Sequence, residues 1–411
     1  MSIIRPFRGI RPSGELASSI AALPYDVYSS AEARRIVQYN PMSFLKIDRA
    51  ETQLPEGTDM YSSQVYETAR DTLNEMIRDG SFIQDSAGCY YIYALTMDGR
   101  TQTGLVGCAS IDDYLNGVIL RHENTLAAKE QDRIRHIDTC SAHTGPIFLT
   151  HRPDERLRRI TERIKMQTVL YDFISEDKIR HQVWKIDRPE DIETISRLYA
   201  QMPHLYIADG HHRAASAVKV GLARRAADPG FSGSEEYNFF LSVLFPSDEL
   251  KIYGYDRVVT DKNGYTFASF LDKIKDGFEV THVGTGPCRP AHKGEFGIYS
   301  GGAWYMAEAR ASLRSDDPVR GLDVSILQDH ILAPVLGIKD PKNDPRIRFV
   351  GEIKGAAALQ KAADASGGIA FSMYPTSMEE LLRIADSGRL MPPKSTWFEP
   401  KLRSGLFIHR F

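Results

Sequence analysis

Residues 205–218 read Leu-Tyr-Ile-Ala-Asp-Gly-His-His-Arg-Ala-Ala-Ser-Ala-Val. The four apolar residues at 205–208 are typical of a short buried strand, and the alanine-rich run at 214–218 has high helix propensity. Gly210 lies between them, where the chain must turn, and glycine lets the backbone approach a ligand closely. The stretch therefore predicts a strand, a tight turn and a helix, with residues 209–213 at the amino end of that helix.

This turn has the properties of an anion site. A helix amino terminus offers unpaired amides and the positive end of the helix dipole. Arg213 can fork onto phosphate oxygens, and His211 and His212 add donors, a proton carrier or metal ligands. The alternative is that Asp209 merely caps the helix and the histidines are ordinary surface residues. Because the segment places four polar groups where a cap needs one, the sequence favours binding.

A second polar cluster lies in residues 121–135. It begins Arg-His-Glu-Asn-Thr and continues with Lys129, Asp132, Arg133 and Arg135. Acidic and basic residues alternate as they would around a phosphate and a metal ion. A solvated helix with ion pairs four residues apart would show a similar composition, so both interpretations stay open.

A third cluster occupies residues 392–401, Pro-Pro-Lys-Ser-Thr-Trp-Phe-Glu-Pro-Lys. The two prolines favour an extended loop that presents Lys394 and Ser395. Residues 389–411 carry five basic and one acidic side chain, a net charge of +4, which suits a loop that closes over an anion. A mobile tail is the alternative, although the aromatic pair at 397–398 indicates that the segment packs down.

The rest of the chain alternates helices and strands without a regular βαβ spacing, which predicts an α+β fold. We expect a hairpin of strands at 90–95 and 103–110, because Asp98-Gly99 favours a tight turn between them. A turn-rich stretch at 261–264 suggests a division into a catalytic domain, 1–258, and a smaller α+β domain, 259–411, whose tail returns to the site. Helices are predicted at 61–79, 151–165, 190–201, 266–276, 322–336, 355–365 and 377–386.

Composition bounds the function. The chain has 411 residues, a net charge of −3, 42% hydrophobic and 26% charged residues. It is long enough for two or three domains, and its charge balance argues against a nucleic-acid partner. No apolar signal core or membrane-spanning run is present, and the four cysteines lack metal-like spacing, so we expect a cytoplasmic protein without a membrane partner. The common phosphate-loop, dinucleotide, serine-hydrolase and zinc-protease motifs are missing.

At these clusters the sequence resembles the bacterial family catalogued as domain of unknown function 1015. The resemblance spans nearly the whole chain, and the Asp-Gly-His-His-Arg segment also looks like the phosphate motif of the ParB/sulfiredoxin superfamily, which includes free serine kinases. It implies a ParB/sulfiredoxin-like core in the first domain. The matching segments are Arg5-Pro6-Phe7-Arg8-Gly9, Leu23-Pro24-Tyr25-Asp26-Val27, Asn40-Pro41, Arg121-His122-Glu123 with Thr125, Ala208-Asp209-Gly210-His211-His212-Arg213, Leu322-Asp323-Val324-Ser325 and Met391-Pro392-Pro393-Lys394-Ser395-Thr396.

The resemblance implies a small-molecule kinase that transfers a phosphoryl group from ATP or ADP to a hydroxyl, with free serine as one acceptor. Glu123 is the first candidate for the base that takes the hydroxyl proton, Asp26 is the second, and His212 is a further catalytic candidate. Mg²⁺ would bridge phosphate oxygens, with Asp209 as its candidate ligand. The expected phosphate-binding residues are Gly210, His211, His212, Arg213, Arg121, Lys129, Arg133, Lys394 and Ser395.

Two other classes stay open. A ParB-type regulator would bind nucleotide without transferring phosphate, but such proteins usually carry a basic DNA-reading helix, which this sequence lacks. A metal-dependent hydrolase could use His122, Glu123, His211 and His212 around Zn²⁺ or Mn²⁺. The kinase hypothesis makes a structural prediction of its own, namely that the clusters at 121–135, 209–213 and 394–401 converge.

Overall fold

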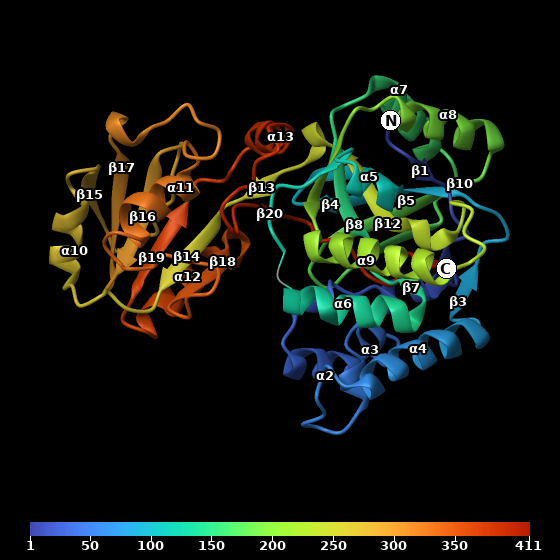
Figure 1. Cartoon of the computed structure of the whole chain (residues 1–411). Helices are drawn as coiled ribbons and strands as arrows, with labels where there is room; N and C mark the ends of the chain where they lie inside the picture. Colours follow the sequence, from blue (N-terminus) through green and yellow to red (C-terminus); the bar gives the residue numbers. More distant parts are fainter. Residues whose placement is uncertain (126) are drawn as a thin grey trace. The chain divides into compact units, whose positions relative to one another are not determined.

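The computed structural model divides the chain into two compact units (Figure 1). Unit 1 comprises residues 1–121, 125–250 and 400–411, and unit 2 comprises residues 122–124 and 251–399. The structure describes residues 1–125 and 127–411, and the side chains of 127–129 lie outside the description. The mixed α+β class is confirmed. The functional division at residue 258 and the ParB/sulfiredoxin-like core stay predictions.

Unit 1 is built, within the described residues, on a nine-stranded mixed sheet. Its strand order is β6-β11-β8-β12-β5-β4-β10-β9, and β1 pairs with β5 at the side. The β6–β11 and β8–β12 pairs are parallel, and the other pairs are antiparallel. The strands are β1 (Ile4–Arg5), β4 (Tyr90–Met97), β5 (Arg100–Ser110), β6 (Ile119–Leu120), β8 (Ile147–His151), β9 (Tyr171–Ile174), β10 (Arg180–Ile186), β11 (Leu205–Asp209) and β12 (Phe239–Pro246).

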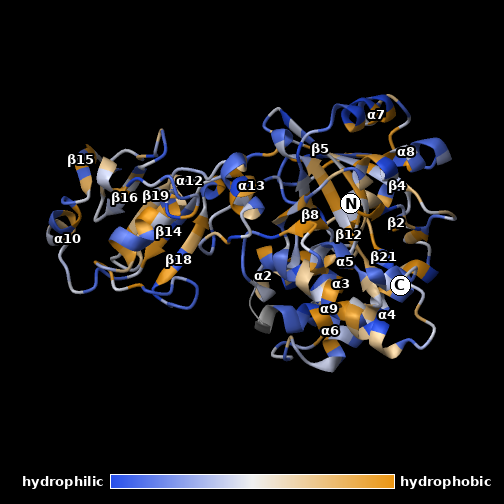
Figure 2. Cartoon of the chain, turned by 45° about the horizontal axis from the view of Figure 1, so that its top comes forward, coloured by the Kyte–Doolittle hydropathy of each residue, from blue (hydrophilic) through white to orange (hydrophobic). Residues whose placement is uncertain are grey.

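The predicted hairpin is confirmed as β4 and β5, which pair from Tyr91 with Val106 to Met97 with Arg100. Asp98 and Gly99 both have positive φ, at 51° and 77°, as the two-residue turn of a tight hairpin requires. Strands β8 and β12 are predominantly apolar (Figure 2), which fits their place in the middle of the sheet. Two short pairs, β2 with β3 and β7 with β21, join distant segments: β2 (Ile10–Pro12), β3 (Phe82–Gln84), β7 (Ala142–His143) and β21 (His409–Arg410).

The helices of unit 1 include a stack in which α6 lies between α9 and α4 (Figure 1). Helix α9 turns Ala214, Ala217 and Val218 into the core beneath the sheet, which places its amino end at the end of β11. Helix α7 begins four residues later than the predicted 151, because Asp154 accepts the amides of Arg156 and Leu157 as its cap. The helices are α1 (Ala17–Ile20), α2 (Ser30–Tyr39), α3 (Leu45–Asp48), α4 (Ser63–Arg78), α5 (Ile111–Leu115), α6 (Ala127–Cys140), α7 (Glu155–Lys165), α8 (Pro189–Ala200) and α9 (His211–Ala227).

Unit 2 has, in its described part, a six-stranded antiparallel sheet ordered β15-β17-β16-β19-β14-β18. The predicted helix at 322–336 is shorter than expected, since α11 (Asp323–Leu327) passes into a π-helical turn over Gln328–Leu332. The other elements are β13 (Ile252–Tyr253), β14 (Tyr255–Val259), α10 (Phe267–Ile274), β15 (Phe278–Gly284), β16 (Glu295–Ser300), β17 (Ala303–Ala309), β18 (Ile347–Gly351), α12 (Gly355–Asp364), β19 (Ile369–Met373), α13 (Met378–Asp386) and β20 (Trp397–Phe398). In the part of the chain that the structure describes, no helix has the length and apolar character that crossing a bilayer requires.

Candidate functional site

The predicted strand, turn and helix at 205–218 are present as β11, Gly210 and α9. Gly210 has φ 93° and ψ 31°, a left-handed conformation that glycine adopts without the penalty of a Cβ atom. The amide of Ala214 donates to the Gly210 carbonyl at 2.9 Å, which is the first hydrogen bond of the helix. The amides of residues 211–213 therefore lie at the open amino end of a 17-residue helix, where the helix dipole favours an anion.

Asp209 is held in its ionised form at this turn. One carboxylate oxygen accepts the amide of Gly210 at 2.8 Å, and the other pairs with the Lys401 ammonium at 3.0 Å. Burial raises the pKa of the Asp209 carboxyl, but the positive charges of Lys401 and Arg213 together lower it by more. The pKa of Asp209 therefore lies below its usual range. A divalent cation at Asp209 would have to displace the Lys401 ammonium. The role of Asp209 as a metal ligand stays a prediction, since the Lys401 ammonium already pairs with its carboxylate.

Arg213 belongs to the first turn of α9, and its guanidinium lies beside Gly210. Its Nη1 donates to the Pro146 carbonyl, which follows β7 in the chain. A Cβ atom built on Gly210 would lie 3.1 Å from Arg213 Nη2, and one built on Gly145 would lie 3.6 Å from Nη1. The two glycines therefore leave room for the guanidinium, which lies against the backbone where the anion is expected.

We expect Gly210→Ala to lower the free energy of unfolding by about 1–2 kcal/mol, the cost of a left-handed non-glycine residue. The added methyl group would also press on the Arg213 guanidinium. Denaturant unfolding measures the change, and Gly230→Ala is the control, because Gly230 has no positive φ and an added Cβ would make only an ordinary contact. Equal losses in the two variants would contradict the strained turn.

A cavity of about 20 Å³, lined by charged and apolar side chains, adjoins Arg213 and has room for about one water molecule or one hydroxyl group. Arg133 from α6 reaches it, stacks on the Tyr25 ring at 3.9 Å, and pairs with Asp132 at 2.9 Å. The predicted phosphate-binding residues Arg133 and Arg213 thus share one cavity. Its lining consists of Pro24, Tyr25, Asp48, Arg133, His136, Ile137, His143, Thr144, Gly145, Ile147, Arg213, Leu241 and Ser404.

The other predicted residues occupy different positions. Asp26 is exposed, next to Tyr25, and Arg121 is exposed at the end of a segment of unit 1. Glu123 belongs to unit 2, as do Lys394 and Ser395. The side chain of Lys129 lies outside the described residues. Convergence of the three clusters, and the roles of all these residues, stay predictions.

The 392–401 segment is ordered within unit 2 as far as residue 399. Ser395 is buried, and its hydroxyl donates to the Pro392 carbonyl at 2.6 Å. The Lys394 carbonyl accepts from Arg257 Nη2 at 3.0 Å, and Lys394 itself has φ 60°. Within the same unit, the His122 ring lies 3.3 Å from the Thr396 hydroxyl. The segment is therefore packed, as its aromatic pair indicated.

The structure adds cavity residues that the sequence analysis missed, above all Asp48, His136 and His143. The Thr144 hydroxyl donates to Asp48 at 2.8 Å, although 96 positions separate them in the chain. None of these residues belongs to a recognisable motif, and they meet only because α3, α6 and β7 are brought together by the fold. In the sequence, His136 and His143 are simply two histidines seven positions apart, and no local periodicity marks them as parts of a shared site.

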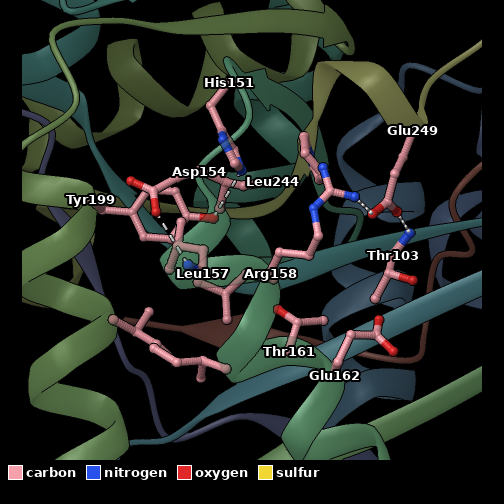
Figure 3. Close-up of a pocket in the computed structure, with 14 residues that line it drawn as sticks. Thr103, His151, Asp154, Leu157, Arg158, Thr161, Glu162, Tyr199, Leu244 and Glu249 are labelled. Atoms are coloured by element: carbon pink, nitrogen blue, oxygen red, sulfur yellow. Dashed lines mark hydrogen bonds and ion pairs between the residues drawn. The ribbon is translucent and has the colours of Figure 1, made fainter.

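A second cavity, of about 30 Å³, lies among α7, α8 and the neighbouring strands (Figure 3). Several of its polar groups have partners within the described structure: Glu249 accepts the Thr103 amide at 2.7 Å, and His151 lies 3.4 Å from the Tyr199 hydroxyl. Its remaining walls are mostly apolar, and none of the predicted site residues that the structure describes lines it. The cavity beside Arg213 is the better candidate.

The chain belongs to the family described as Protein of unknown function (DUF1015), whose model matches residues 4–325. The expected family membership is confirmed. No curated protein matches the sequence.

Several solved structures share remote similarity with the chain. A free serine kinase in complex with AMP is 14% identical, with a TM-score of 0.37 over 77% of this chain and 92% of that one. SbnI with a C-terminal truncation, from Staphylococcus aureus, is 11% identical, with a TM-score of 0.40 over 74% of this chain and 87% of that one. A conserved hypothetical protein from Pyrococcus furiosus is 15% identical, with a TM-score of 0.35 over 73% and 93% of the two chains.

Proposed function

We propose that this protein is a nucleotide-dependent kinase that transfers a phosphoryl group to the hydroxyl of a small molecule, with free serine the first acceptor to test. The observation that carries the proposal is the left-handed Gly210 at the amino end of α9, with Arg213 beside it. Phosphoryl transfer depends mainly on positioning and on neutralising negative charge, and this turn offers both.

The donors around the turn suit phosphate oxygens. The amides of residues 211–213 and the Arg213 guanidinium would bind the phosphates, and Arg133 lines the same cavity as Arg213. Lys401 adds a third positive charge, held in place by Asp209. Mg²⁺, with Asp209 as its candidate ligand, would supply further neutralisation of the phosphate charge. The donor chemistry of the site therefore fits a nucleotide phosphate.

The acceptor hydroxyl needs a base. Glu123 is the first candidate and Asp26 the second, and His212, which belongs to the first turn of α9, is a further candidate. The exposed position of Asp26, next to Tyr25 at the cavity, supports a role at the entrance rather than in the interior. These assignments are part of the proposal.

The test is nucleotide consumption by the purified protein against a panel of amino acids and sugars, with ATP and ADP as donors. We expect turnover with one hydroxyl compound, loss of turnover in Glu123→Gln, and weakened nucleotide binding in His212→Ala. Calorimetry establishes whether the nucleotide binds. Tight nucleotide binding without turnover for any acceptor would contradict the kinase and favour a nucleotide-sensing regulator, and stoichiometric Zn²⁺ or Mn²⁺ in the purified protein would favour the hydrolase.

A further inference from the structure

A chain of three titratable side chains runs from the surface of unit 1 to the cavity beside Arg213. Glu236, whose side chain is 54% exposed, lies 2.8 Å from Nε2 of the buried His409. Nδ1 of His409 lies 3.2 Å from Nδ1 of His143, and His143 lines the cavity. The two imidazoles stack with their planes 19° apart, because β7 and β21 place His143 and His409 directly opposite each other.

Counting protons along this chain assigns the tautomers. Glu236 is ionised, since the bond from His409 lowers its pKa although burial raises it. His409 therefore donates its Nε2 proton to Glu236, and a neutral His409 has only a lone pair at Nδ1. The contact between the two Nδ1 atoms needs one proton, which His143 must then supply. That leaves the Nε2 atom of His143 with a lone pair.

This lone pair has no hydrogen-bond partner among the described residues, and the atom is shielded from solvent. Burial, followed by the nearby His409, lowers the pKa of His143 far below its usual value, so the ring stays neutral. His136, which lines the same cavity, shows the same state: its Nε2 donates to the Ile47 carbonyl at 3.2 Å, and its buried Nδ1 has no partner in the described structure. Two imidazole acceptors thus line a cavity that also holds the guanidinium donors Arg133 and Arg213 and the carboxylate of Asp48, which accepts the Thr144 hydroxyl.

A buried acceptor without a partner is costly, so it is normally satisfied by a ligand or water that donates a proton. The cavity has room for one such hydroxyl-sized group. Arg213 lines the same cavity, and its guanidinium lies beside Gly210, so a hydroxyl in the cavity would lie next to the proposed phosphate-binding turn. The titratable and charged groups that line the cavity with His143 are Tyr25, Asp48, Arg133, His136 and Arg213, and His409 and, through it, Glu236 are bonded to His143.

We propose that Glu236, His409 and His143 form a proton relay that accepts the acceptor's hydroxyl proton at His143 Nε2. The inference rests on the proposed kinase function for its substrate, and it adds His143 to Glu123 and Asp26 as a candidate for the group that contacts the reacting hydroxyl. His409 and Glu236 are positioning residues, because they act through His143.

The step balances. The O–H bond of the acceptor breaks and a bond from the proton to His143 Nε2 forms. The Nδ1 proton of His143 moves to His409 Nδ1, and the Nε2 proton of His409 moves to Glu236, from which solvent removes it. The electron pair of the acceptor oxygen forms the new P–O bond, while the bond to the nucleotide leaving group breaks and its electron pair leaves with the nucleotide.

The first experiment is NMR of the full-length protein with ¹⁵N-labelled histidine, with resonances assigned by their loss in His143→Gln and His409→Gln. We expect His143 to carry its proton on Nδ1 and His409 on Nε2 near neutral pH. A proton on His143 Nε2, or an imidazolium at His143, overturns the relay. Because this measurement needs no turnover, its outcome is independent of whether the protein is a kinase.

The second experiment uses turnover with the acceptor found by the panel. Loss of a positioned proton acceptor typically costs 10²–10⁴-fold in rate, so we expect His143→Gln to lower kcat by about that factor with nucleotide affinity unchanged. His409→Phe should retain the ring packing against Phe7 and lower kcat less. The matched control is His151→Gln, a buried histidine at the other cavity, with kcat unchanged. Unchanged kcat in His143→Gln overturns the relay but leaves the kinase proposal intact. If no acceptor is found, the kinase proposal is overturned, and the NMR experiment still decides whether the tautomers are as proposed.

Discussion

Asp85→Asn is expected to lower the free energy of unfolding by about 3 kcal/mol, in the range typical of a broken buried ion pair. Asp85 is 6% exposed and follows β3. One oxygen accepts from Arg11 Nη2 at 3.0 Å and Lys185 Nζ at 3.1 Å, and the other from Arg11 Nε at 3.0 Å and the Tyr91 hydroxyl. Asparagine keeps the shape but leaves the buried Arg11 without its counterion.

The same carboxylate predicts a pH dependence of stability. Burial raises the pKa of Asp85, but the bonds from Arg11, Tyr91 and Lys185 outweigh it and lower the pKa from 3.8 to about 2. A pKa that is lower in the folded protein means stability that is present above the unfolded value of 3.8 and is lost as the pH falls toward 2. The shift corresponds to roughly 2 kcal/mol. The wild-type protein should therefore lose stability over this interval more steeply than Asp85→Asn.

Urea denaturation at a series of pH values measures both effects. The matched control is Asp71→Asn, because Asp71 pairs with Arg70 on the surface, where the two side chains are 65% and 43% exposed. Solvent screens such a pair, so the control should unfold almost as the wild type does. If the two variants lose equal stability, or if Asp85→Asn keeps the full acid dependence of the wild type, Asp85 is not the hub of this cluster.

Local features of the structure could be predicted from the sequence. The turn at Gly210 was visible because a strand, a glycine and a run of alanines are adjacent in the chain, and the hairpin was visible because Asp98-Gly99 separates two apolar runs. The predicted helix boundaries were off by a few residues where a side chain caps the helix, as Asp154 does at the start of α7. Such features depend on neighbours within a few positions, which periodicity and capping rules describe well.

The composition of the cavity could not be predicted in the same way. Lys401 and Asp209 are 192 positions apart, and His143 and His409 are 266 apart. Their meeting depends on strand register and on the path of the C-terminal residues 400–411 back to unit 1, neither of which a single sequence specifies. Charge and turn chemistry identified Arg133 and Arg213 as candidates, whereas the histidines that share their cavity carried no pattern of their own.

Arg213→Ala is expected to weaken nucleotide binding by about 10–100-fold, if the turn at Gly210 binds phosphate as proposed. A hydrogen bond to a charged group contributes about 1.5–3 kcal/mol, and each 1.4 kcal/mol is a tenfold change in affinity. The guanidinium is fixed by the Pro146 carbonyl on one side and lies over Gly210 on the other, so little ordering is needed when the anion binds. Arg213→Lys keeps the positive charge but cannot both bond to the Pro146 carbonyl and lie over Gly210. The nucleotide affinity of this variant should therefore fall between those of the wild type and Arg213→Ala.

Isothermal calorimetry with ATP and with ADP measures the change. The matched control lies on the same helix: Arg224, in the last turn of α9, pairs with Asp138 away from the Gly210 turn. Arg224→Ala removes the same side chain and one positive charge, so a general electrostatic effect would weaken binding equally in both variants. We expect the loss in Arg213→Ala alone, and a loss of the same size in Arg224→Ala would show that the amino end of α9 is not where the phosphates bind.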